Sequence, residues 1–111
     1  MARPLTYPLS ALALILIVAG PSPAGTVSWD GGAGTDDWND ALNWDTDMVP
    51  GPGDDVVIDV PADITVRYPS GTTEIASLTC AETFRMQSGI LNVTNCTFDG
   101  ELIWVGGRID R

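Results

Sequence analysis

The chain has 111 residues, with 15 acidic residues, five arginines and no lysine or histidine, so its formal net charge is −10 at pH 7. This length accommodates one small domain and excludes two of ordinary size. The charge argues against nucleic acid and against an anionic membrane surface as partners, because both require a basic surface on the protein.

Residues 1–24 have the features of a secretory signal peptide. Arg3 supplies positive charge, residues 11–19 form a short apolar run, and small residues and prolines follow. The run is too short to span a bilayer, and Ser22 and Ala24 fit the small-residue positions before a cleavage site. We therefore predict a secreted or cell-surface protein with no membrane span after cleavage.

The composition changes near residue 55. Residues 25–54 are rich in Gly, Asp, Asn and Trp, and residues 40–44 are the one candidate for a helical segment, of one turn at most. Residues 55–111 alternate short β-rich runs with Gly, Ser and Asn: VVIDV, ITVRY, IASLTC, FRMQ, ILNVTN and ELIWV. A period of two with β-branched residues predicts strands, so the fold class is all-β.

A repeat of 18 residues runs through the second part of the chain. An apolar residue, a second large apolar residue two places on, and a glycine-containing turn recur at residues 66–71, 84–89 and 102–107. One such unit cannot enclose a core, whereas stacked units with parallel strands can. The repeat predicts a β-solenoid over residues 55–111, with 25–54 as an N-terminal cap segment. Chance self-similarity within another all-β fold is the alternative.

Several short motifs resemble the opening of large bacterial secreted or surface proteins of the adhesin-like and autotransporter-passenger-like kind. They are Trp29-Asp30-Gly31-Gly32, Trp38, Asn43-Trp44, Pro50-Gly51 and Asp54-Asp55-Val56-Val57-Ile58. The resemblance implies a right-handed parallel β-helix whose first coils follow a signal peptide and a cap. Because such relatives are many coils longer, and because a solenoid needs closed ends, we expect this chain to be the N-terminal fragment of a longer protein.

The expected function is therefore that of an exported scaffold with an adhesion or carbohydrate-binding role, whose partner is a polysaccharide or another cell-surface component. We expect no enzyme, because no Ser, Thr or Cys has a recognisable activating partner and no His or Lys is present. Two alternatives stay open. One is the start of a polysaccharide-active β-helix lyase or glycoside hydrolase, and the other is a self-contained calcium- or carbohydrate-binding module.

Three sets of residues are candidates for a site. An indole face offers a sugar ring an apolar surface, so Trp29, Trp38 and Trp44 are candidates for carbohydrate binding, although burial in a core is the commoner role. Carboxylates are ligands for Ca²⁺, so Asp30, Asp36, Asp37 and Asp40 are candidates for binding this ion, although their spacing differs from that of a calcium loop. No other cofactor is expected. Cys80 and Cys96 are candidates for a disulfide in an exported protein, or else for small buried residues.

Overall fold

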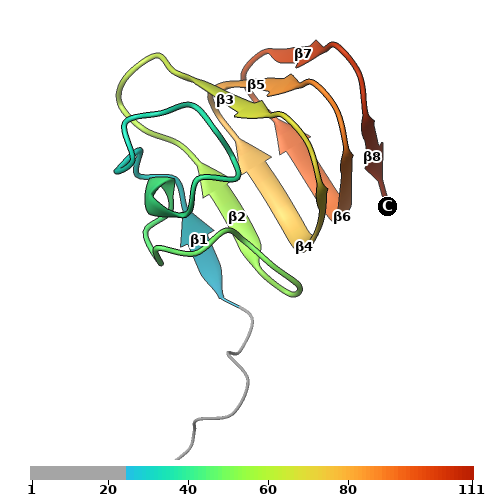
Figure 1. The fold of residues 1–111 in the computed structure, drawn as a ribbon, viewed down its shortest axis with the longest axis horizontal. Coiled ribbons are helices and arrows are strands. Elements are labelled where there is room, and N and C mark those ends of the chain that lie inside the picture. The colour runs from blue at the N-terminus through green and yellow to red at the C-terminus, as the bar shows by residue number, and fades with distance from the viewer. Residues whose placement is uncertain (1–24) are drawn as a thin grey trace, which may run out of the picture.

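The computed structural model describes residues 25–111; the predicted signal peptide, residues 1–24, lies outside them. Parallel strands stack into a β-solenoid of about three turns, which confirms the all-β prediction and the parallel solenoid (Figure 1). Five strands form the first sheet, in the order β1 (Thr26–Ser28), β2 (Asp55–Ile58), β4 (Thr72–Cys80), β6 (Ile90–Phe98) and β8 (Arg108–Asp110). Three strands form the second, in the order β3 (Thr65–Tyr68), β5 (Thr83–Met86) and β7 (Leu102–Trp104).

The register of the sheets confirms the 18-residue repeat from β3 onward. Val66 pairs with Phe84, and Phe84 with Leu102, while Ile90 pairs with Arg108 in the first sheet. The earlier coils are longer than the repeat, because Thr26 pairs with Asp55, and Asp55 with Ser77. The extra residues lie in the loops, and the strands keep their parallel pairing.

The core is built from the inward side chains of every coil. In β3 and β5 the alternation is strict, so that Val66, Tyr68, Phe84 and Met86 are fully buried. In β4 the buried residues Ile75 and Leu78 are three positions apart, which shifts the alternation. Since side chains of a straight strand alternate with a period of two, this shift marks a bend where the coil turns from one side to the next.

The turn after each strand of the second sheet depends on a glycine. Gly71, Gly89 and Gly107 all have positive φ, at 95°, 84° and 78°, a region that other residues enter only with strain. Gly89 also packs directly on the backbone carbonyl of Gly71, and a Cβ on Gly107 would lie 2.8 Å from the carbonyl oxygen of Gly89. The repeated glycines therefore stack on one another, and this stacking lets successive coils approach.

Residues 29–54 cover the N-terminal end of the core (Figure 1). The candidate helical turn within them is a 3₁₀ helix at Ala41–Asn43, labelled η2. This segment also bonds to the second sheet, because the Arg67 amide donates to the Asp36 carbonyl (2.7 Å) and the Trp38 amide donates to the Arg67 carbonyl (2.9 Å). Within the predicted cap segment, residues 25–54, Thr26–Ser28 form β1, which pairs with β2. Within residues 25–111, no helix has the length and apolar character needed to cross a membrane.

Candidate functional site

The three candidate tryptophans form one aromatic cluster at the capped end. Trp38 and Trp44 are fully buried and Trp29 is 5% exposed. Trp44 lies edge-on to both others, with ring centroids 5.1 Å from Trp29 and 4.8 Å from Trp38. Trp38 continues the cluster into the coils through Tyr68 and Phe84, at 5.5 and 5.9 Å. Edge-to-face aromatic pairs at such distances stabilise a core beyond the area they bury.

This burial determines what the cluster can do. Stacking on a sugar requires an open indole face, and the protein's own side chains and backbone cover the faces of Trp29, Trp38 and Trp44. In this geometry the three side chains close the core, which was the commoner role weighed from the sequence. Trp104, which was not singled out from the sequence, is the exposed tryptophan, at 52%.

Asn43 organises the loop that carries these tryptophans. Among residues 25–111 it is the one polar residue that is fully buried, and both the oxygen and the nitrogen of its side-chain amide have hydrogen-bond partners. Its Oδ1 accepts from the Ala33 amide (3.1 Å), and its Nδ2 donates to Thr35 Oγ1 (2.9 Å) and to the Asp37 carbonyl (3.1 Å). A buried amide with all these bonds fixes one loop conformation, so the Asn43-Trp44 motif is structural in this chain.

The four candidate calcium ligands each have a partner within the protein. Asp30 Oδ1 accepts from the Gly32 amide, Asp37 Oδ1 accepts from the Asn39 amide, and Asp40 Oδ2 accepts from the Thr35 hydroxyl, all within 2.8–3.0 Å. Asp36 forms an ion pair with Arg67. Their carboxylates do not converge, and no group of three or more acidic or sulfur side chains in residues 25–111 is arranged to hold a metal ion.

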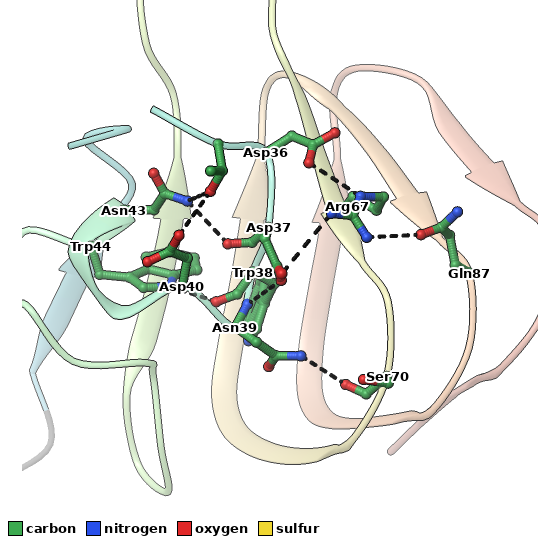
Figure 2. A network of polar contacts seen from close by, with 11 residues as sticks. Asp36, Asp37, Trp38, Asn39, Asp40, Asn43, Trp44, Arg67, Ser70 and Gln87 are labelled. Atoms are coloured by element: carbon green, nitrogen blue, oxygen red, sulfur yellow. Dashed lines mark hydrogen bonds and ion pairs between the residues drawn. The ribbon is translucent and has the colours of Figure 1, made fainter. Parts of the chain in front are cut away.

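Arg67 joins the cap to the coils, which the sequence analysis did not anticipate. Its Nε lies 3.1 Å from Asp36 Oδ1, a terminal nitrogen lies 4.0 Å from Asp37, and the other donates to Gln87 Oε1 at 3.3 Å (Figure 2). Asn39 adds a second link by donating from Nδ2 to the Ser70 carbonyl (3.0 Å). The sequence shows an aspartate-rich loop and an arginine 31 residues after Asp36, but this spacing does not predict that the two form an ion pair.

Cys80 and Cys96 are free thiols on the same inward side of neighbouring strands. Cys96 is paired with Leu78, and Cys80 with Phe98, so the two cysteines are diagonal neighbours. Diagonal positions on adjacent strands are about 7–8 Å apart at Cα, beyond the usual range for a disulfide. Burial is the main cause that raises the pKa of Cys80 to about 11, and burial also raises the pKa of Cys96. Both thiols are therefore protonated and weakly nucleophilic near neutral pH.

A hollow of about 470 Å³ lies beside the cap, between the loop around Pro50 and the start of β4. Its lining includes Glu74 and the amides Asn39 and Asn92, and Glu74 is the one ionisable side chain among the described residues that line it. A single carboxylate between amides suits hydrogen bonding to a polar ligand. General acid and base catalysis of glycoside cleavage instead uses two carboxyl groups on opposite sides of the bond.

No protein-family model matches this chain, and comparison with curated proteins and with solved structures finds no significant match.

Proposed function

We propose that this protein is an exported β-solenoid scaffold that works by presenting a flat sheet face to a polysaccharide or another cell-surface component, without catalysis. The scaffold role is supported by the fact that the residues of the core and those of the turns have structural roles. The aromatic and aliphatic side chains close the core and its capped end, and the glycines set the turns. The outward positions of the strands are thereby left for binding.

The observation that carries the binding role is a pair of columns on the outer face of β1, β2, β4 and β6, in which all side chains except that of Val57 are polar. Register places these side chains in two parallel rows across the four strands: Thr26, Asp55, Ser77 and Asn95 in one, and Ser28, Val57, Thr79 and Thr97 in the other. Neighbouring strands are about 4.8 Å apart. Hydroxyl and amide side chains at a regular spacing, with the Asp55 carboxylate among them, favour a ligand that is itself extended and repetitive.

The test compares two matched double variants in binding to insoluble polysaccharides, measured by co-sedimentation. Thr79→Arg with Thr97→Arg places two large cations in one column of this face. Thr72→Arg with Thr94→Arg makes the same change at exposed positions off the columns, and Thr72 also lines the hollow beside the cap, so this pair tests the hollow as the alternative place of binding. We expect the first pair to abolish binding and the second to retain it. Equal behaviour of the two pairs, or no binding by the unchanged protein, would contradict the proposed face.

Export is tested separately by cell fractionation with an antibody against residues 25–111. The proposal expects the protein outside the cytoplasm, with its N-terminus at or near residue 25 by Edman sequencing. Retention in the cytoplasm with residues 1–24 intact would contradict it, whatever the binding result.

A further inference from the structure

The hollow beside the cap is lined by hydrogen-bond acceptors from three separate parts of the fold. Glu74 comes from β4, Asn92 from β6 and Asn39 from the cap segment. Glu74 and Asn92 are in register on adjacent parallel strands, so their backbones are about 4.8 Å apart. Asn39 Nδ2 donates to the Ser70 carbonyl at 3.0 Å (Figure 2), and its Oδ1 remains as an acceptor. One carboxylate and two amide oxygens therefore border the same hollow.

The charge of Glu74 is not neutralised within the part of the chain that the structure describes. The ion pairs of residues 25–111 join Arg67 and Arg108 to aspartates, and none of them includes Glu74. No described arginine lines the hollow, and the whole protein has a net charge of −10. A carboxylate in such surroundings attracts a cation. Calcium sites use six to eight oxygen ligands with several carboxylates among them, so this single carboxylate suits an organic cation instead.

Another part of the lining is apolar. Val49 and Pro52 border the hollow, in the loop between the 3₁₀ helix and β2, and Val49 also packs against the core. Methylene groups can lie along such a surface while a charged end group reaches polar partners. An ammonium group has three donors and no acceptor, which matches a carboxylate and two amide oxygens. The volume of about 470 Å³ is ample for a small aliphatic amine.

We propose that this hollow binds a primary ammonium group carried on an aliphatic stem. The ammonium group lies at Glu74, Asn39 and Asn92, and the stem lies along Val49 and Pro52. A free aliphatic amine and the lysine side chain of a partner protein share this chemistry. None of these residues belongs to the two columns of the first sheet, so the inference does not rest on the proposed polysaccharide face.

The test is titration of the purified protein with n-pentylamine, followed by NMR of the amide signals. We expect the side-chain amide signals of Asn39 and Asn92 and the backbone amide of Glu74 to shift, with an affinity in the millimolar range for so small a ligand. The alcohol n-pentanol has the same stem without the charge and should leave these signals unchanged. Nα-acetyl-lysine amide distinguishes the two sources of the ammonium group. Binding at least as tight as that of n-pentylamine assigns the site to a lysine side chain, and weaker binding assigns it to a free amine.

Two variants and one matched control locate the binding. Glu74→Gln removes the charge with little change of shape and should weaken n-pentylamine binding at least tenfold. Glu101→Gln makes the same chemical change at an exposed position outside the hollow and should leave the affinity unchanged. Thr72→Arg places a cation in the lining and should abolish amine binding. Circular dichroism shows whether each variant folds.

Three outcomes would overturn the proposal. They are the absence of shifts with n-pentylamine, equal shifts with n-pentanol, and an affinity that Glu74→Gln and Glu101→Gln change to the same extent. Failure here is distinguishable from failure of the proposed function, because T79R/T97R should lose polysaccharide and keep the amine, whereas Glu74→Gln should lose the amine and keep polysaccharide.

Discussion

The indole Nε1 of Trp44 donates a 2.9 Å hydrogen bond to the backbone carbonyl of Trp38, while the two rings meet edge-on at 72°. This contact satisfies the one polar atom of the Trp44 side chain inside the core, and it fixes the Trp38 backbone beside β3. The same short segment therefore both fills the end of the core and hydrogen-bonds along the edge of the second sheet. A cap built in this way is part of the core rather than a loop laid over it.

Fluorescence quenching separates the buried tryptophans from the exposed one. Iodide should quench only the emission of Trp104, because Trp29, Trp38 and Trp44 are at most 5% exposed and Trp104 is 52% exposed. Trp104→Phe should remove the quenchable component and leave the rest. Addition of oligosaccharide should leave the emission of the three buried tryptophans unchanged. A shift of the emission maximum of Trp104→Phe on addition of oligosaccharide would instead support sugar binding by these tryptophans.

Asn43→Asp tests the buried amide with almost no change of shape. The substitution removes the donor to the Asp37 carbonyl and places a carboxylate against that oxygen, which should lower the free energy of unfolding by about 2–3 kcal/mol. Urea denaturation measures the difference. Asn95→Asp, at an exposed position, makes the same chemical change and should stay within about 0.5 kcal/mol of the unchanged protein.

The stacked turn glycines offer an internal comparison. A Cβ on Gly71 meets nothing within 4 Å, so Gly71→Ala should lose only the conformational preference, about 1–2 kcal/mol. A Cβ on Gly89 would also collide with the Gly71 backbone, so Gly89→Ala should lose roughly 3–5 kcal/mol. Thermal denaturation ranks the two. Similar losses of stability in the two variants would show that the turns at Gly71 and Gly89 can move apart to accommodate the added Cβ without strain.

The ion pair between Arg67 and Asp36 should contribute modestly, since their side chains are 31% and 51% exposed. A double-mutant cycle with Arg67→Met and Asp36→Asn should give a coupling energy of about 0.5–1 kcal/mol. That coupling should nearly vanish at about 1 M salt, where the screening length falls to roughly 3 Å. A coupling energy that persists at high salt would mean that it does not come from the charges. It would then come from the backbone hydrogen bond between Asp36 and Arg67.

Cys80 predicts how stability changes at high pH. Burial raises the pKa of Cys80 in the folded protein from 9.0 to about 11. Between these values the unfolded chain loses the proton and the folded protein keeps it, so stability present below pH 9 should fall as the pH rises through 11. Cys80→Ala should reduce this fall, measured by urea midpoints, and leave the smaller part that comes from Cys96 and Tyr68, whose pKa values burial also raises. Rapid alkylation of native Cys80 at pH 8 would contradict its burial.

The coils were predictable because their information is local and repeated. Val66, Phe84 and Leu102 occur at equal offsets, and each is followed by a glycine turn, so the period alone predicts the register. The 3₁₀ helix at Ala41–Asn43 falls within residues 40–44, the one candidate for a helical turn in the sequence. The two extended first coils, in which Thr26 reaches Asp55 and Asp55 reaches Ser77, gave no such signal because their loops do not repeat.

The cap contacts could not be read from the sequence, for a different reason. Arg67 and Asp36 are 31 residues apart, and Asn39 and Ser70 have the same separation. Their partnership depends on the path of an irregular loop, and no period encodes such a path. The tryptophans illustrate the same limit, since residue type made a buried plug the commoner role but left a binding face open, and the position of Trp38 against Tyr68 and Phe84 supports the plug.

The separation of inward, turn and outward positions has a consequence for how this protein can change over time. The inward residues and the stacked glycines set the shape of each 18-residue coil, whereas exposed positions such as Thr79, Asn95 and Thr97 do not hold it together. Substitutions at those positions can therefore accumulate one at a time with little effect on folding. A lineage carrying this framework can acquire a new surface specificity by small steps, and a designer can graft one in the same way.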